Sequence, residues 1–303
     1  MNYLISKSFL FVLIFVLGLS ACRGTNDNDG FGNDTSGFTL SITDGPIEGA
    51  RSVVIPITGI EVKPRNDAAI SFNLDPPFED NLLDFQNGLS EILLDDISLA
   101  EGEYDHIRLI VDDANAFIEL NNNQRFDLPI GAGFESQLQI NLNFTIDNED
   151  ETDFTIDFDL RKSVFDMGAN VFELRPSLRL ARTQESGTLR GTVAESLITS
   201  STCNNGISND EGNVVYLFDG TVTAQDIQGN AGDPIATGIV SRSNSSSNHS
   251  FTIGFLAPGN YTAVFTCNAV RDEPAEDNNF AMRFSNPENV TVVQGDSNNI
   301  NFN

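Results

Sequence analysis

The stretch LQINLNFTI at residues 138–146 decides the fold class, because apolar and polar residues alternate along it without interruption. A second alternating stretch, FTIDFDL at residues 154–160, follows an acidic segment. In an extended strand such alternation places all apolar side chains on one face and all polar ones on the other. The two stretches therefore predict an antiparallel hairpin that is half-buried against a core, with an acidic turn at residues 147–151.

Short strand-like runs bounded by turn residues continue on both sides of this pair, from residue 38 to residue 302. Few of them show a helical spacing of apolar residues, so we expect an all-β chain. The exception is the segment from Ser90 to Leu94, where a serine followed by an acid predicts the start of a short helix. A second hairpin is expected to close the chain at residues 290–302.

The length of 303 residues favours two domains over one large core. The strand pattern restarts after a short polar link near residues 183–187. We predict two β-sandwich domains in tandem, the first at residues 38–182 and the second at residues 188–303.

The amino terminus has the pattern of an export signal. Residues 9–19 are apolar apart from Gly18, which is too short a run for a permanent membrane span, so residues 1–21 predict a signal peptide. The segment LSAC at 19–22 resembles a bacterial lipobox, which implies that Cys22 carries lipid and that residues 22–37 form a flexible tether. Arg23, where inner-membrane retention would place Asp, predicts an outer-membrane anchor in a Gram-negative host.

Charge excludes one class of partner. Lys and Arg number 16 against 44 Asp and Glu, for a net charge of −28, and such a field repels nucleic acid. An acidic surface could also attract divalent cations or a basic partner, although solvation is the commoner role. Two His, three Cys and no Trp leave little material for zinc or histidine chemistry, and we predict no cofactor.

Clusters of acidic residues could indicate a calcium site or a catalytic carboxylate pair, and each has a simpler structural explanation. Asp112, Asp113, residues 147–153, Asp157 and Asp159 supply oxygens for calcium, but the spacing of a dedicated calcium loop is absent, so a solvated surface is preferred and no metal site is predicted. Asp157 and Asp159 share a strand face and could act as paired carboxylates. Arg161 follows them, and an ion-pair row on an exposed sheet explains all three, so no catalytic residue is predicted.

Two cysteines remain once Cys22 is lipidated. Cys203 and Cys267 both lie in the second predicted domain of an exported chain, where oxidation is permitted. A disulfide between them is the expected arrangement. The alternative is that both thiols are free or bind a metal, but no His partners lie near them to complete a metal site.

Six segments in the first predicted domain carry a family resemblance. They are LSITDGP (40–46), IEVKP (60–64), LLDFQNG (82–88), GEYDHIRL (102–109), DFDLRKS (157–163) and LRPSLRL (174–180). In this order they resemble the bacterial lipoprotein family catalogued as domain of unknown function 4382. The resemblance implies a lipoprotein with a β-sandwich-like domain, and it carries no catalytic or binding residue. The strand and turn pattern of residues 188–303 is similar to carboxypeptidase regulatory-like and starch-binding-like sandwiches.

Together these features predict a non-catalytic lipoprotein of the outer membrane, facing the periplasm or the exterior, that acts as an adhesive, scaffold or interaction module. Its partners are expected to be the membrane, through the lipid on Cys22, and an envelope protein or glycan. Carbohydrate binding by the second domain is the alternative. Phe is abundant but Trp is absent and Tyr scarce, so the starch-binding-like pattern indicates shape more than sugar binding.

Overall fold

The computed structural model describes residues 34–147, 151–201, 203, 211–242, 249–274 and 282–303. The signal peptide (1–21), Cys22 and nearly all of the predicted tether lie outside these residues. Residues 31–303 form one compact unit. Within the described part, strands dominate and the two α-helices are single turns, so the predicted all-β class is confirmed.

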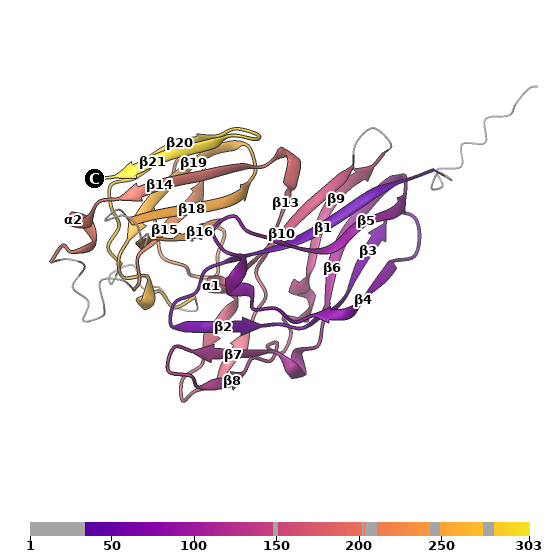
Figure 1. The fold of residues 1–303 in the computed structure, drawn as a ribbon, viewed down its shortest axis with the longest axis horizontal. Coiled ribbons are helices and arrows are strands. Elements are labelled where there is room, and N and C mark those ends of the chain that lie inside the picture. The colour runs from indigo at the N-terminus through magenta and orange to yellow at the C-terminus, as the bar shows by residue number, and fades with distance from the viewer. Residues whose placement is uncertain (1–33, 148–150, 202, 204–210, 243–248, 275–281) are drawn as a thin grey trace, which may run out of the picture. The chain divides into compact units, whose positions relative to one another are not determined.

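Two four-stranded sheets build the N-terminal lobe, which we define as residues 35–182 (Figure 1). The first sheet has the order β13 (Leu178–Arg182), β10 (Thr152–Asp159), β1 (Thr35–Gly45), β5 (Glu91–Ala100). The second has the order β4 (Ile70–Phe78), β3 (Ile57–Pro64), β6 (Gly102–Val111), β9 (Gln139–Ile146). The apolar faces of both sheets contribute to one buried cluster.

Smaller elements complete this lobe. A three-stranded sheet joins β2 (Ala50–Val54), β7 (Phe117–Leu120) and β8 (Arg125–Asp127), and a two-stranded sheet joins β11 (Val164–Asp166) and β12 (Phe172–Leu174). The helical turns are α1 (Leu160–Ser163), η1 (Leu82–Phe85), η2 (Asp113–Asn115), η3 (Glu135–Leu138) and η4 (Thr183–Glu185).

The C-terminal lobe, residues 187–302, also has two four-stranded sheets. One has the order β17 (Ser241–Arg242), β18 (His249–Leu256), β14 (Gly187–Val193), β21 (Ser297–Phe302). The other has the order β16 (Ala236–Ile239), β15 (Val214–Asp219), β19 (Gly259–Thr266), β20 (Glu288–Val292). Single turns occur at α2 (Glu195–Ile198) and η5 (Ala269–Arg271). Separate apolar clusters line its sheets, while independent folding of the two predicted domains stays a prediction.

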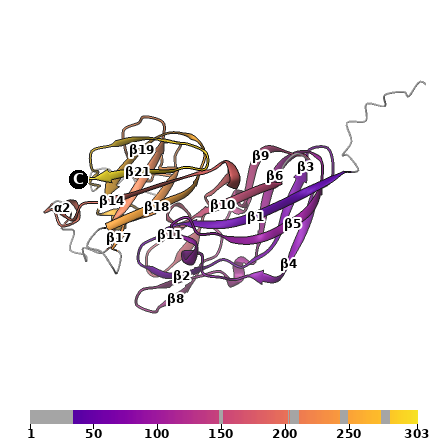
Figure 2. The ribbon, with the colours of Figure 1, turned by 45° about the horizontal axis from the view of Figure 1, so that its top comes forward.

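Both predicted hairpins are wrong. Strand β9 pairs with β6, whereas β10 is parallel to its neighbour β1 (Figure 2). The other neighbour of β10 is β13, to which it is antiparallel. The two alternating stretches face each other across the core, where the rings of Phe144 and Phe154 lie 5.2 Å apart. In the same way β20 pairs with β19 and β21 pairs in parallel with β14, so the closing segment spans two sheets.

The predicted helix at residues 90–94 is also wrong, because these residues begin strand β5. Seven residues of β5 pair antiparallel with β1, from Ala100 opposite Thr35 to Glu91 opposite Ile42. Pairing with a long central strand outweighs the weak local preference of a capping signature.

Candidate functional site

The segment DFDLRKS (157–163) begins a set of buried charged contacts at the end of strand β10. Asp157 and Asp159 are only 6% and 3% exposed, and Arg161 is 3% exposed. The expectation of an ion-pair row on an exposed sheet is therefore wrong. The polar face of β10 is covered at its carboxyl end, because this end meets the C-terminal lobe.

Local hydrogen bonds explain why the chain turns here. The Asp159 side chain accepts a hydrogen bond from the backbone N–H of Lys162 at 3.2 Å and so caps the single turn α1. The Ser163 hydroxyl donates to the Asp159 carbonyl at 2.6 Å and accepts from the Ser177 N–H at 2.9 Å. These bonds fix the side chains of Arg161 and Lys162 at the strand end.

Each charged residue of the segment has a partner of opposite charge. The Arg179 guanidinium on β13 donates to Asp157 at 2.6 Å, from the position directly opposite in the sheet. The Lys162 ammonium lies 2.9 Å from the Asp159 carboxylate. Arg161 pairs with Glu48, which lies just before β2.

All three cations also donate to a backbone carbonyl of the C-terminal lobe. The acceptors are the carbonyls of Phe255 for Arg179, Pro234 for Lys162 at 3.1 Å, and Ala269 for Arg161 at 3.5 Å. A guanidinium or ammonium has several donors, so one cation can neutralise a carboxylate and cap a carbonyl at once. We call these three ion pairs and their carbonyl acceptors the lobe joint.

A second buried network adjoins Arg161. Its guanidinium carbon lies 5.8 Å from the centre of the Tyr216 ring, and the Tyr216 hydroxyl donates to the Asp272 carboxylate. The backbone N–H of Ile227 also donates to Asp272, at 3.1 Å. Burial raises the pKa of Asp272 to about 6, against the opposing effects of the Tyr216 hydrogen bond and the nearby Arg161 charge.

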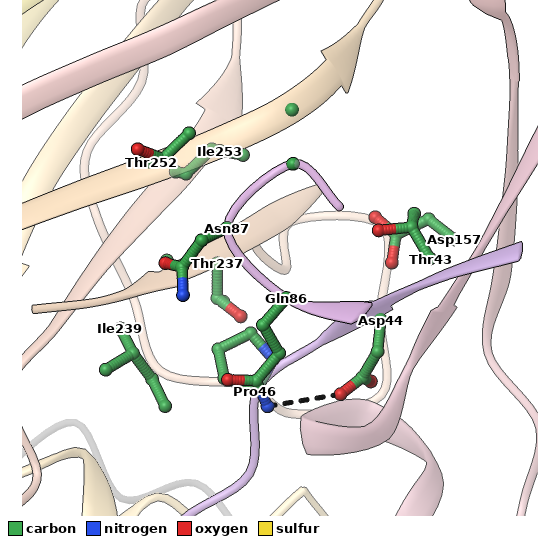
Figure 3. A pocket seen from close by; sticks show the side chains of 13 residues that line it. Thr43, Asp44, Pro46, Gln86, Asn87, Asp157, Thr237, Ile239, Thr252 and Ile253 are labelled. Atoms are coloured by element: carbon green, nitrogen blue, oxygen red, sulfur yellow. Dashed lines mark hydrogen bonds between the residues drawn. The ribbon is translucent and has the colours of Figure 1, made fainter. Parts of the chain in front are cut away.

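Asp44, at the end of β1, is a third buried carboxylate beside Asp157 and Asp159. One of its oxygens accepts from the Gln86 amide at 3.3 Å, as Figure 3 shows. Burial raises the pKa of Asp44 well above its ordinary value, and the neighbouring Asp157 charge raises it further. The burial of Asp44 could have been predicted from the sequence. Asp44 follows Phe38, Leu40 and Ile42 at every second position, so its side chain lies on the same face of the strand as these buried residues.

The predicted disulfide is present. Cys203 and Cys267 are bonded, with their Cα atoms 5.5 Å apart. The bridge joins the end of β19 to the chain that follows α2, while residues 204–210 next to Cys203 lie outside the described residues.

The described residues can be compared, through their own side chains and helices, with the requirements of a metal site and of a membrane span. They contain no group of three or more His, Cys, Asp and Glu side chains arranged to hold a metal ion. No helix within the same ranges is long and apolar enough to cross a membrane.

Comparison with known families addresses the N-terminal lobe. Residues 35–176 match the family model described as Domain of unknown function (DUF4382). The DUF4382 match includes Asp44, Asp157, Asp159, Arg161 and Lys162 and ends before Arg179, so it covers most of the N-terminal side of the lobe joint. No curated protein matches the chain.

Solved structures show only distant likeness. GBS52, the minor pilin of Streptococcus agalactiae, is 8% identical with a TM-score of 0.20, over 88% of this chain and 94% of that one. BcpA, the major pilin subunit of Bacillus cereus, is 9% identical with a TM-score of 0.21, over 89% and 99%. The Bacillus anthracis TIE protein is 10% identical with a TM-score of 0.20, over 87% of this chain, which spans only 33% of the TIE chain. Scores this low carry no argument about function.

Proposed function

We propose that the protein is a non-catalytic lipoprotein of the bacterial outer membrane that acts as an adhesive, scaffold or interaction module. The observation that carries this proposal is the lobe joint. Asp157, Asp159 and Arg161, which the sequence analysis considered for catalysis, are tied up in ion pairs within the N-terminal lobe. The cations of these pairs, Arg179, Lys162 and Arg161, donate to carbonyls of the C-terminal lobe and so connect the two sandwiches. A reaction needs acid and base groups that can reach a substrate, whereas Asp157, Asp159 and Arg161 are buried and paired.

A mechanical role explains this use of charge. Each sandwich has its own apolar cluster, so hydrophobic burial by itself would leave the two free to move against each other. Three directional contacts fix one orientation, and a fixed orientation lets a tethered protein hold a binding surface at a set distance from its anchor. The predicted lipid on Cys22 supplies the anchor.

Metabolic labelling tests the anchor. A palmitate analogue should label the wild-type protein in its host, and Cys22→Ser should lose the label and leave the membrane fraction. Cys203→Ser is the matched control, because it removes a different thiol and should keep the label. Labelling that persists in the Cys22→Ser protein would contradict the anchoring proposal.

Carbohydrate binding through the C-terminal lobe is the second candidate, and this lobe lines one side of a groove of about 660 Å³ whose other side belongs to the N-terminal lobe. In it Arg175 lies over the rings of Phe134 and Phe165, at 4.9 and 4.2 Å from their centres. Phe165 is buried, whereas Phe134 is partly exposed. Gln228 and Asn230 of the C-terminal lobe add amide groups, and a partly exposed ring beside amides suits sugar recognition. A glycan array probed with the full chain and with the Phe134→Ala variant separates the two candidates. Glycan binding that is lost in Phe134→Ala would favour carbohydrate binding.

A further inference from the structure

Three buried oxygen atoms without a hydrogen-bond partner line one small cavity between the lobes. They are Asp44 Oδ1, Asp157 Oδ1 and Thr237 Oγ1, and none has a partner among the described residues. The two carboxylates come from neighbouring strands of the N-terminal lobe, and the hydroxyl comes from β16 of the C-terminal lobe (Figure 3). Each of the three side chains is more than nine-tenths buried.

Three such oxygens on residues that line one cavity require an explanation, because an unsatisfied buried oxygen costs about 1–3 kcal/mol, and a charged one more. The cavity has a volume of about 20 Å³. That volume holds one particle the size of a water molecule or of a single ion without its hydration shell.

The charge count favours an ion over a water molecule. Three carboxylates gather here, on Asp44, Asp157 and Asp159, whereas Arg179 and Lys162 are the cations paired with them. An ionised Asp44 would be the one carboxylate left without a cation, because its hydrogen-bond partner is the neutral Gln86 amide. A water molecule would complete the hydrogen bonds but leave this charge buried and uncompensated.

We propose that this cavity binds one hard cation of the size of calcium or sodium, with Asp44, Asp157 and Thr237 as side-chain ligands. Oxygen atoms are the ligands such ions prefer, and main-chain carbonyls commonly complete their shell. Because the ligands come from both lobes, the ion adds a fourth contact to the lobe joint. The inference stands apart from the proposed function, since it concerns binding and requires neither a lipid nor a partner.

Ion binding to the full chain tests the proposal. The chain is stripped with a chelator, transferred to a choline buffer and titrated with Ca²⁺, Na⁺ or Mg²⁺ in parallel, with calorimetry and thermal unfolding as readouts. We expect one equivalent of Ca²⁺ or Na⁺ to bind and to raise the melting temperature. Mg²⁺ keeps its water shell more firmly and should bind at least about tenfold more weakly than the ion that fits.

Three variants locate the site. Asp44→Asn keeps the shape but removes the surplus charge and should weaken binding by at least about tenfold. Thr237→Val removes only the ligand from the C-terminal lobe, should weaken binding by a smaller factor, and carries the test if Asp44→Asn fails to fold. Asp113→Asn removes an exposed carboxylate elsewhere and should bind within about twofold of wild type.

Two results would overturn the proposal. The first is that Ca²⁺ and Mg²⁺ raise the melting temperature equally, and do so in Asp44→Asn as much as in Asp113→Asn. This result would mean that the ions only screen the acidic surface. No ion binding at all would mean that Asp44 holds a proton and a water molecule fills the cavity. A preference for Na⁺ or for Ca²⁺ supports the site and identifies the charge that it accepts.

Discussion

Arg161→Met tests the buried ion pair that positions Arg161 in the lobe joint. It removes a buried guanidinium while keeping much of its volume, and it leaves Glu48, whose side chain is 14% exposed, without its partner. Breaking a buried ion pair by removing one member costs about 3–5 kcal/mol. The contact with the Ala269 carbonyl is long, at 3.5 Å, and adds little to that figure.

The expected change in melting temperature follows from size. For a unit of this length, 1 kcal/mol corresponds to about 2–4 °C, so Arg161→Met should lower the melting temperature by roughly 6–20 °C. Scanning calorimetry measures this fall, and it should also resolve two transitions if the lobes have lost their coupling.

Two further variants make the test decisive. Adding Glu48→Leu to Arg161→Met removes the stranded charge and should recover most of the loss, because a buried pair replaced by apolar residues is often nearly neutral. Arg182→Met breaks an exposed pair with Glu185 and should cost no more than about 1 kcal/mol. If Arg161→Met and Arg182→Met destabilise equally, or if the double variant is no better than Arg161→Met, the joint does not depend on this ion pair.

Three more predictions concern the pH dependence of stability, the disulfide and a close contact between two backbone segments. The raised pKa of Asp272, about 6 against 3.8, means that the folded chain holds its proton more tightly, so this group's stabilisation is complete below pH 3.8 and about 3 kcal/mol of it is lost as the pH rises to 6. Asp272→Asn should abolish that decline in urea titrations across this range. Reducing Cys203–Cys267, which are 64 residues apart, should lower stability by about 4 kcal/mol, and alkylation without reductant should label neither thiol. In Gly254→Ala the new Cβ would lie 2.8 Å from the Cα of Gly88, so we expect a loss of about 1–3 kcal/mol by chemical unfolding.

Local pattern was sufficient for several features. Alternation correctly predicted strands at β9 and β10, because the face on which a side chain lies depends only on its position along an extended chain. The pairing of Cys203 with Cys267 followed from the number of thiols that an exported chain has left. The resemblance of the first lobe likewise rested on segments that can be read in order along the chain.

Other features depended on contacts between distant residues. Alternation fixes a strand's face but not its neighbour, so the parallel pairs of β1 with β10 and of β14 with β21 had no local signal. The prediction of a helix at residues 90–94 was wrong for a related reason, since seven residues of β5 pair with a strand far away in sequence.

The candidate site shows the same division between sequence and tertiary structure. The sequence predicted that Asp157, Asp159 and Arg161 pair with one another on an exposed sheet, whereas each is buried and has a different partner. Only the tertiary structure brings Arg179, Glu48 and the carbonyls of the second lobe to them. Burial of a charge depends on which distant surface covers it and which partner reaches it, and neither is encoded in the spacing of nearby residues.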